Sequence, residues 1–77
     1  MDCNQARAQI PDEAPSAKQV LCTLLEESPL TMKDIQTRSG LARRTVYGAV
    51  RKLRDMGMLA EKPSLRDTRQ TLFWPNV

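Results

Sequence analysis

The stretch SGLARRTVYGAVRKLRDMGML, residues 39–59, decides the fold of this chain. Val46, Val50 and Leu53 recur at spacings of four and three residues, which places them on one face of a helix expected over 42–56. Gly57 follows them, where a left-handed C-cap belongs. The opposite face carries Arg43, Arg44, Tyr47, Gly48 and Arg51. The pattern predicts a helix that is half core and half cationic surface.

A shorter helix is expected just before it, over 32–38. Thr31 suits the N-cap of this helix, and Asp34 can reach back to close a shortened capping box. Residues 39–41 contain Gly40 and form a tight break. Two helices joined by such a turn, with cations at the start of the second, predict a helix-turn-helix.

Strand-like runs at 58–62 and 70–74 flank a polar loop, and this pattern predicts a hairpin. A very short strand at 29–31 is expected to pair with it. Upstream, Ser16 is the expected N-cap of a first helix over 17–27, which carries an apolar stripe. We therefore predict an α+β winged helix-turn-helix, with three helices and a small antiparallel β-hairpin as the wing. The domain is expected to span 16–77, after a flexible arm at 1–15.

The expected core combines the apolar faces of these elements. Its members are Val20, Leu21, Leu24, Leu25, Leu30, Ile35, Leu41, Val46, Val50, Leu53, Leu59 and at least one of Leu72, Phe73 and Trp74.

Residues 32–74 resemble the winged helix-turn-helix domain of archaeal and bacterial regulators of the MarR and TrmB type. The matching residues are Leu41, Arg44, Val46, Tyr47, Leu53, Gly57, Met58, Leu59 and the wing motif Asp67-Thr68-Arg69. The resemblance implies that the long helix enters the major groove of DNA and that a wing arginine approaches the minor groove. The DNA-binding residues implied are Arg43, Arg44, Thr45, Tyr47, Arg51, Arg66 and Arg69, and we add Lys33 as a phosphate contact.

Several residues of this surface have alternative interpretations. Arg43, Arg44 and Arg51 either contact DNA or are solvated surface residues. The ring of Tyr47 either covers the edge of the core or brings its hydroxyl to a phosphate. Gly48 either permits close approach to a DNA backbone or has no role. Arg69 occupies the family-like wing position, but Arg66 becomes the inserted residue if Asp67, which we expect to brace the loop, holds Arg69 in place.

Charge is distributed unevenly along the chain, although the net charge is only +3. Residues 1–30 hold two basic and five acidic residues, whereas residues 31–69 hold ten basic and four acidic residues. This polarity points to an acidic partner for the second half of the chain.

Several functional classes lack support in the sequence. The chain has two cysteines and no histidine, which excludes the usual four-ligand zinc site. We expect Cys3 and Cys22 to be free thiols, and the alternative is a redox-sensing or intermolecular pair. Neither a catalytic constellation nor a glycine-rich phosphate loop is visible, so we expect no enzyme and no cofactor. No run approaches the ~18 apolar residues that span a bilayer, and the start lacks the apolar segment of a signal peptide. We expect a cytoplasmic protein.

Two functions from different classes remain. The first is a small transcriptional regulator that binds double-stranded DNA sequence-specifically, as a homodimer on a near-palindrome, with no small-molecule effector evident. The second is a protein–protein interaction module, or a subunit of a larger nucleic-acid-processing assembly. Exposed Arg43, Arg44 and Arg51 favour DNA, because interaction-type winged helices tend to display apolar or acidic residues there.

Overall fold

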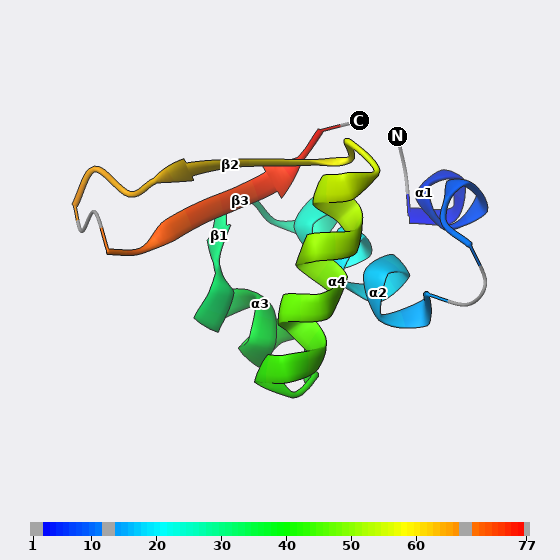
Figure 1. Cartoon of the computed structure of the whole chain (residues 1–77), viewed down its shortest axis with the longest axis horizontal. Coiled ribbons are helices and arrows are strands. Elements are labelled where there is room, and N and C mark those ends of the chain that lie inside the picture. Colours follow the sequence, from blue (N-terminus) through cyan, green and yellow to red (C-terminus); the bar gives the residue numbers. More distant parts are fainter. Residues whose placement is uncertain (1–2, 12–13, 67–68, 77) are drawn as a thin grey trace.

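The computed structural model describes residues 3–11, 14–66 and 69–76, and Figure 1 shows their arrangement. These residues form helices on one side of a three-stranded antiparallel sheet, which confirms the α+β winged-helix class. The elements are α1 (Cys3–Gln9), α2 (Pro15–Glu26), β1 (Leu30–Thr31), α3 (Met32–Ser39), α4 (Arg43–Asp55), β2 (Leu59–Pro63) and β3 (Thr71–Pro75).

The sheet has the order β1-β3-β2, with β3 in the centre. Leu30 of β1 lies opposite Phe73, and Glu61 of β2 lies opposite the same residue on its other side. The short first strand and the hairpin are therefore confirmed. Because side chains alternate across a strand, Phe73 is buried while Leu72 and Trp74 are only partly covered.

The turn between α3 and α4 forms as the sequence predicts. The Asp34 amide donates to Thr31 Oγ1 at 3.2 Å, and the Thr31 amide donates to Asp34 Oδ2 at 3.3 Å, which completes the capping box. Gly40 ends α3 with φ +72°, and Gly57 follows α4 with the same φ. Both are left-handed conformations that other residues adopt only at a cost.

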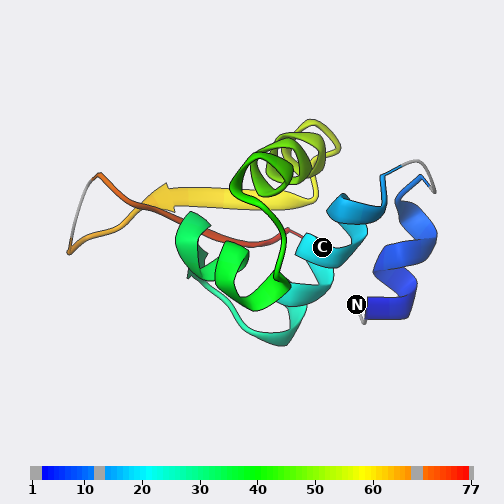
Figure 2. The same cartoon turned by 90° about the horizontal axis from the view of Figure 1, so that it is seen from below.

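The core lies where α2, α3 and α4 meet the inner face of the sheet. Figure 2 shows α2 between α1 and the rest of the molecule, and α2 also packs against α4. Of the expected core residues, Leu25 and Leu41 are only partly buried, since each lies at the edge of the cluster. The buried residues that the expected core omitted are Ala6, Ile10, Ala17, Cys22, Ala49 and Met58.

The expected flexible arm at 1–15 is wrong for its described residues, because 3–9 form the additional helix α1. Ala6 is 0% exposed and Ile10 is 3% exposed, and both belong to the same core cluster as α2 and α4. Cys3, Ala6 and Ile10 recur at spacings of three and four, which is a helical stripe. The packed body thus includes α1 and has four helices among its described residues.

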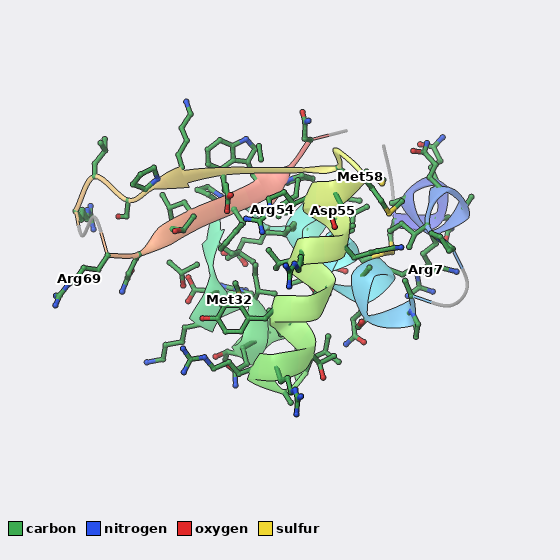
Figure 3. The ribbon with its side chains drawn as sticks, viewed as in Figure 1. Arg7, Met32, Arg54, Asp55, Met58 and Arg69 are labelled. Atoms are coloured by element: carbon green, nitrogen blue, oxygen red, sulfur yellow. A yellow bond between two sulfur atoms is a disulfide. The ribbon has the colours of Figure 1, made fainter. Side chains whose placement is uncertain are left out.

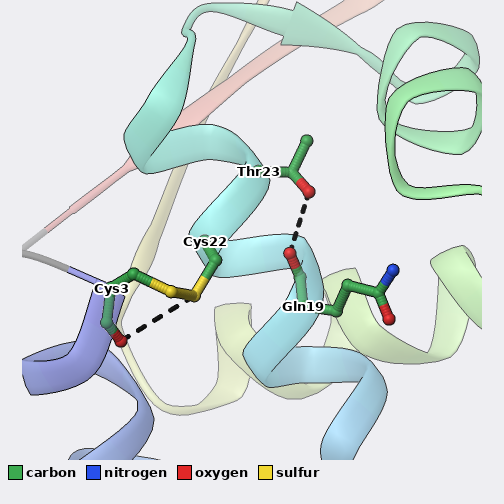
Figure 4. Close-up of a disulfide and its surroundings, with 4 residues drawn as sticks. All are labelled: Cys3, Gln19, Cys22 and Thr23. Carbon is green, nitrogen blue, oxygen red and sulfur yellow. Dashed lines mark hydrogen bonds between the residues drawn. A yellow bond between two sulfur atoms is a disulfide. The ribbon is translucent and has the colours of Figure 1, made fainter.

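The expectation of free thiols is also wrong, because Cys3 and Cys22 form a disulfide that joins α1 to α2 (Figure 4). The first helix of the prediction begins earlier than expected, at Pro15, and its N-cap is Ala14 rather than Ser16. Proline is favoured at the first helical position because the missing amide would have no intrahelical partner there.

Two glycines give opposite predictions for stability. No described atom lies within 4 Å of a Cβ built at Gly48 or at Gly57, so backbone conformation alone decides each outcome. Gly57→Ala should lower the free energy of unfolding by about 1–2 kcal/mol, because alanine is strained at this φ. Gly48→Ala, in a helix interior, should raise it by about 1 kcal/mol. Urea unfolding of both variants checks this, and a shift of the same sign in both would contradict it.

Candidate nucleic-acid interface

A groove of about 950 Å³ lies between α4, α3 and the wing hairpin. Five cationic residues line it, and Glu61 is the only acidic residue among its described lining residues. The cations are Lys33, Arg43, Arg51, Arg54 and Arg69. In Figure 3, Arg69 extends from the hairpin on the same side as α3, and Arg54 lies between α4 and the hairpin. The wing and α4 therefore form the two walls of this groove, which we also call the cationic channel.

Arg43 and Tyr47 interact on the wing-facing side of α4. The Arg43 guanidinium lies 5.4 Å from the centre of the Tyr47 ring, and Arg43 Nη2 donates to the Tyr47 hydroxyl at 3.2 Å. This hydrogen bond raises the pKa of Arg43 above its ordinary value. Tyr47 is 47% exposed. Because its oxygen accepts from Arg43, its own proton remains available to an acceptor in the groove.

Arg54 joins α4 to the wing. Its Nη1 lies 3.1 Å from Oε1 of Glu61 on β2, and both side chains are substantially exposed. An exposed pair of this kind contributes little to stability. Its position nevertheless places one acidic group within the channel, directly beside a cation.

The outward side of α4 carries a second row of residues. At about 100° of rotation per residue, Arg51 and Gly48 lie within about 40° of Arg44 around the helix axis. All three are exposed. Arg43, Tyr47 and Arg54 lie on the flank toward the wing, whereas Thr45 lies on the opposite flank, outside the groove lining.

The first turn of α4 lacks the usual stabilising residues. Its N-cap is Ala42, which makes no side-chain hydrogen bond, and no acidic residue stands in the first turn. Arg43 and Arg44 occupy that turn instead, at the positive end of the helix dipole, where cations are unfavourable. The free amides and the two guanidinium groups are all donors suited to an anion.

The wing is partly described. The Arg66 amide donates to Ser64 Oγ at 3.3 Å, Arg66 is exposed, and Arg69 lines the groove. Asp67 and Thr68 lie outside the described residues, so the bracing role expected for Asp67 receives no structural account.

Five of the predicted site residues line the groove: Lys33, Arg43, Tyr47, Arg51 and Arg69. Arg44, Thr45 and Arg66 are exposed outside its lining. The sequence prediction missed Arg54 and Glu61 as groove residues. The spacing from Arg43 through Tyr47 to Arg54 was a usable signal, because it follows one helical face.

The described residues offer neither a metal site nor a membrane-spanning helix. Among them, no three Cys, Asp or Glu side chains gather in a way that could hold a metal ion. None of the described helices has the length and apolarity needed to cross a membrane.

Comparison with solved structures identifies regulators of the same fold. The chain is similar to BpsR of Bordetella bronchiseptica, whose structure concerns regulation of DNA binding by 6-hydroxynicotinic acid. The two are 24% identical, with 90% of this chain and 54% of that chain covered, at a TM-score of 0.75. It is also similar to the PcaV transcriptional regulator of Streptomyces coelicolor, solved with its natural ligand. Here the identity is 26%, the coverage 91% and 50%, and the TM-score 0.76. The chain spans about half the length of these regulators.

Comparison of the sequence itself gives the family. No curated protein matches the chain. The family model described as sugar-specific transcriptional regulator TrmB matches residues 16–72, which run from α2 into β3. The chain therefore belongs to the TrmB family of transcriptional regulators and has the fold of a winged-helix DNA-binding domain.

Proposed function

We propose that this domain binds double-stranded DNA sequence-specifically, with α4 in the major groove and the wing at 63–70 on the minor groove or backbone. The observation that carries the proposal is the cationic channel between α4 and the wing, with Arg43 and Arg44 at the uncapped start of α4. Recognition helices of this class place their N-terminal residues against base edges. The missing cap and the two cations lower the stability of α4, and an anionic partner bound at this end would supply the interactions that are missing.

The roles divide between the two rows of α4. Arg44 and Arg51, on the outward row, face a duplex that lies across the helix. Arg43 and Tyr47 of α4 and Arg69 of the wing line the channel, and Arg51 of the outward row lines it as well. A phosphate backbone in the channel can accept hydrogen bonds from these residues. Arg66 and Arg69 make the DNA contacts of the wing, and Lys33 and Thr45 add contacts at the edges of the interface. The outward row is cationic, which favours DNA over the interaction-module alternative.

The assembly around this domain is part of the proposal. One small domain offers little surface for tight specific binding, so we propose a homodimer on two half-sites about 10 base pairs apart. The protein would work in the cytoplasm, where the DNA is. BpsR is regulated by a small acid and PcaV was solved with a natural ligand.

The first prediction concerns salt. The cations proposed to contact DNA should neutralise on the order of five phosphates per protomer, so log affinity should fall with log salt at a slope of about −4 to −5. A mobility-shift titration against the DNA upstream of its own gene measures this, with unlabelled random duplex as competitor. A salt-independent affinity, or no binding at low salt, would exclude DNA binding as the function.

A second prediction separates base reading from phosphate contact. Arg44 lies in the first turn of α4, and arginine suits the O6/N7 pair of guanine. Arg44→Ala should cost about 1–3 kcal/mol on the cognate site and reduce the preference over random DNA. Arg51→Ala is the matched control from the same row, and its loss should weaken both sequences alike. Equal losses on both sequences for Arg44→Ala would refute its role in base reading.

A third prediction concerns the acid in the channel. Glu61→Gln removes the negative charge and releases Arg54 from its ion pair. Duplex affinity at low salt should rise by roughly 0.5–1.5 kcal/mol, and the salt slope should steepen by up to about one unit. Glu27→Gln is the control, because it breaks an exposed ion pair with Arg38 that lies outside the groove lining. An equal gain in both variants would show that net charge alone acts, and the channel would have no special role.

A further inference from the structure

The Cys3–Cys22 disulfide is the one covalent link between separate elements among the described residues. It joins α1 to α2 at the end of the molecule opposite the wing loop (Figures 1 and 4). Cys22 is buried and Cys3 is partly exposed, so Cys3 is the more accessible half of the bond. None of the proposed DNA contacts lies on α1 or α2.

The position of α1 depends on its contacts with α2 and on the disulfide. A helix of seven residues is too short to persist alone in water. The buried side chains of Ala6 and Ile10 and the disulfide help to hold it in place. The chain connecting the two cysteines spans 19 positions, so breaking the bond restores considerable freedom to the segment.

The burial of Cys22 shows what α1 covers. Ala17, Val20, Leu21 and Leu24 form the stripe of α2 that belongs to the core cluster. Cys22 lies about 100° around the helix from Leu21, away from that stripe. It is nevertheless only 7% exposed. The flank of α2 that carries Cys22 is therefore covered because α1 is docked on it.

We propose that Cys3–Cys22 is a reversible redox site whose reduction releases α1 from α2. A thiolate of a cellular dithiol or low-molecular-weight thiol attacks the Cys3 sulfur, forms a mixed disulfide there and expels the Cys22 thiolate. A second thiol then attacks the mixed disulfide and frees Cys3. The cysteines gain two electrons and two protons in total, and the reductant leaves as its own disulfide.

The redox environment of the cell makes the bond regulatory, and this step rests on the proposed function. A protein that binds chromosomal DNA works where thiols are kept reduced, and disulfides there are usually transient or redox-sensing. Release of α1 removes Ala6 and Ile10 from the core and uncovers the side of α2 that carries Cys22. The helix α2 is also the one that packs against α4. Reduction thus lowers the stability of the body that holds α4, without altering any DNA contact directly.

The test compares oxidised protein, reduced protein and the Cys3→Ser variant. Reduction and Cys3→Ser should each lower the thermal unfolding midpoint by about 10 °C or more. In both, the amides of residues 3–9 should exchange hydrogen faster than in the oxidised protein. At temperatures near the unfolding midpoint of the reduced protein, the oxidised protein should bind the duplex more tightly than the reduced protein does. At temperatures well below that midpoint, the two forms should bind it equally. Reoxidation of the reduced protein should restore the midpoint.

Cys3→Ser treated with reductant is the matched control, and its midpoint should not move. Equal midpoints and equal exchange in the oxidised and reduced proteins would overturn the proposal. Disulfide-linked dimers in place of the internal bond would overturn it as well. Unfolding and exchange are measured without DNA, so a redox effect on both, with no DNA binding in either state, would refute the proposed function and leave the redox site standing.

Discussion

The packing of α2 against α4 is the contact on which the rest of the structure depends. Val20, Leu21 and Leu24 on one helix and Val46 and Leu53 on the other are all 0% exposed. Because these side chains must face each other, the rotation of α4 about its axis is set, and its cationic side is turned outward. The inner face of the sheet covers the same cluster through Leu30 and Phe73, and this places the wing beside the cationic side of α4. The apolar stripe of one helix thus determines where the charges of the channel lie.

The two helices of the helix-turn-helix begin in opposite ways. At the start of α3, Thr31 and Asp34 satisfy each other's backbone amides in a complete capping box. At the start of α4, Ala42 offers no cap, and Arg43 and Arg44 stand at the unfavourable end of the dipole. A cap residue would add about 1 kcal/mol to the stability of α4. The cap is present on α3, which supports the surface, and missing on α4, which displays the cations. A binding surface on α4 would require free donors at that end.

The sequence predicted α2, α4 and the hairpin from their periodicity, and it predicted α3 from its cap residues. It failed at α1 because the stripe there has only three members, Cys3, Ala6 and Ile10, within a polar segment. A helix this short exists only through tertiary contacts, which local sequence does not encode. The pairing of Cys3 with Cys22 depends on the same docking. For the candidate site, the basic residues of α4 could be identified, but the Arg54–Glu61 pair required the placement of β2 beside the helix.

Gly48 has no structural explanation within the described part of the chain. Glycine in an exposed helix interior costs about 1 kcal/mol relative to alanine, so its presence calls for a reason. No described atom lies within 4 Å of a Cβ built there, and its φ is not left-handed, so neither packing nor backbone conformation within the described chain supplies one. Gly48 nevertheless lines the groove and stands beside Arg44 and Arg51 on the outward row of α4. Close approach of a DNA backbone at this position, beside the two arginines, stays a prediction, with no role for Gly48 as its alternative.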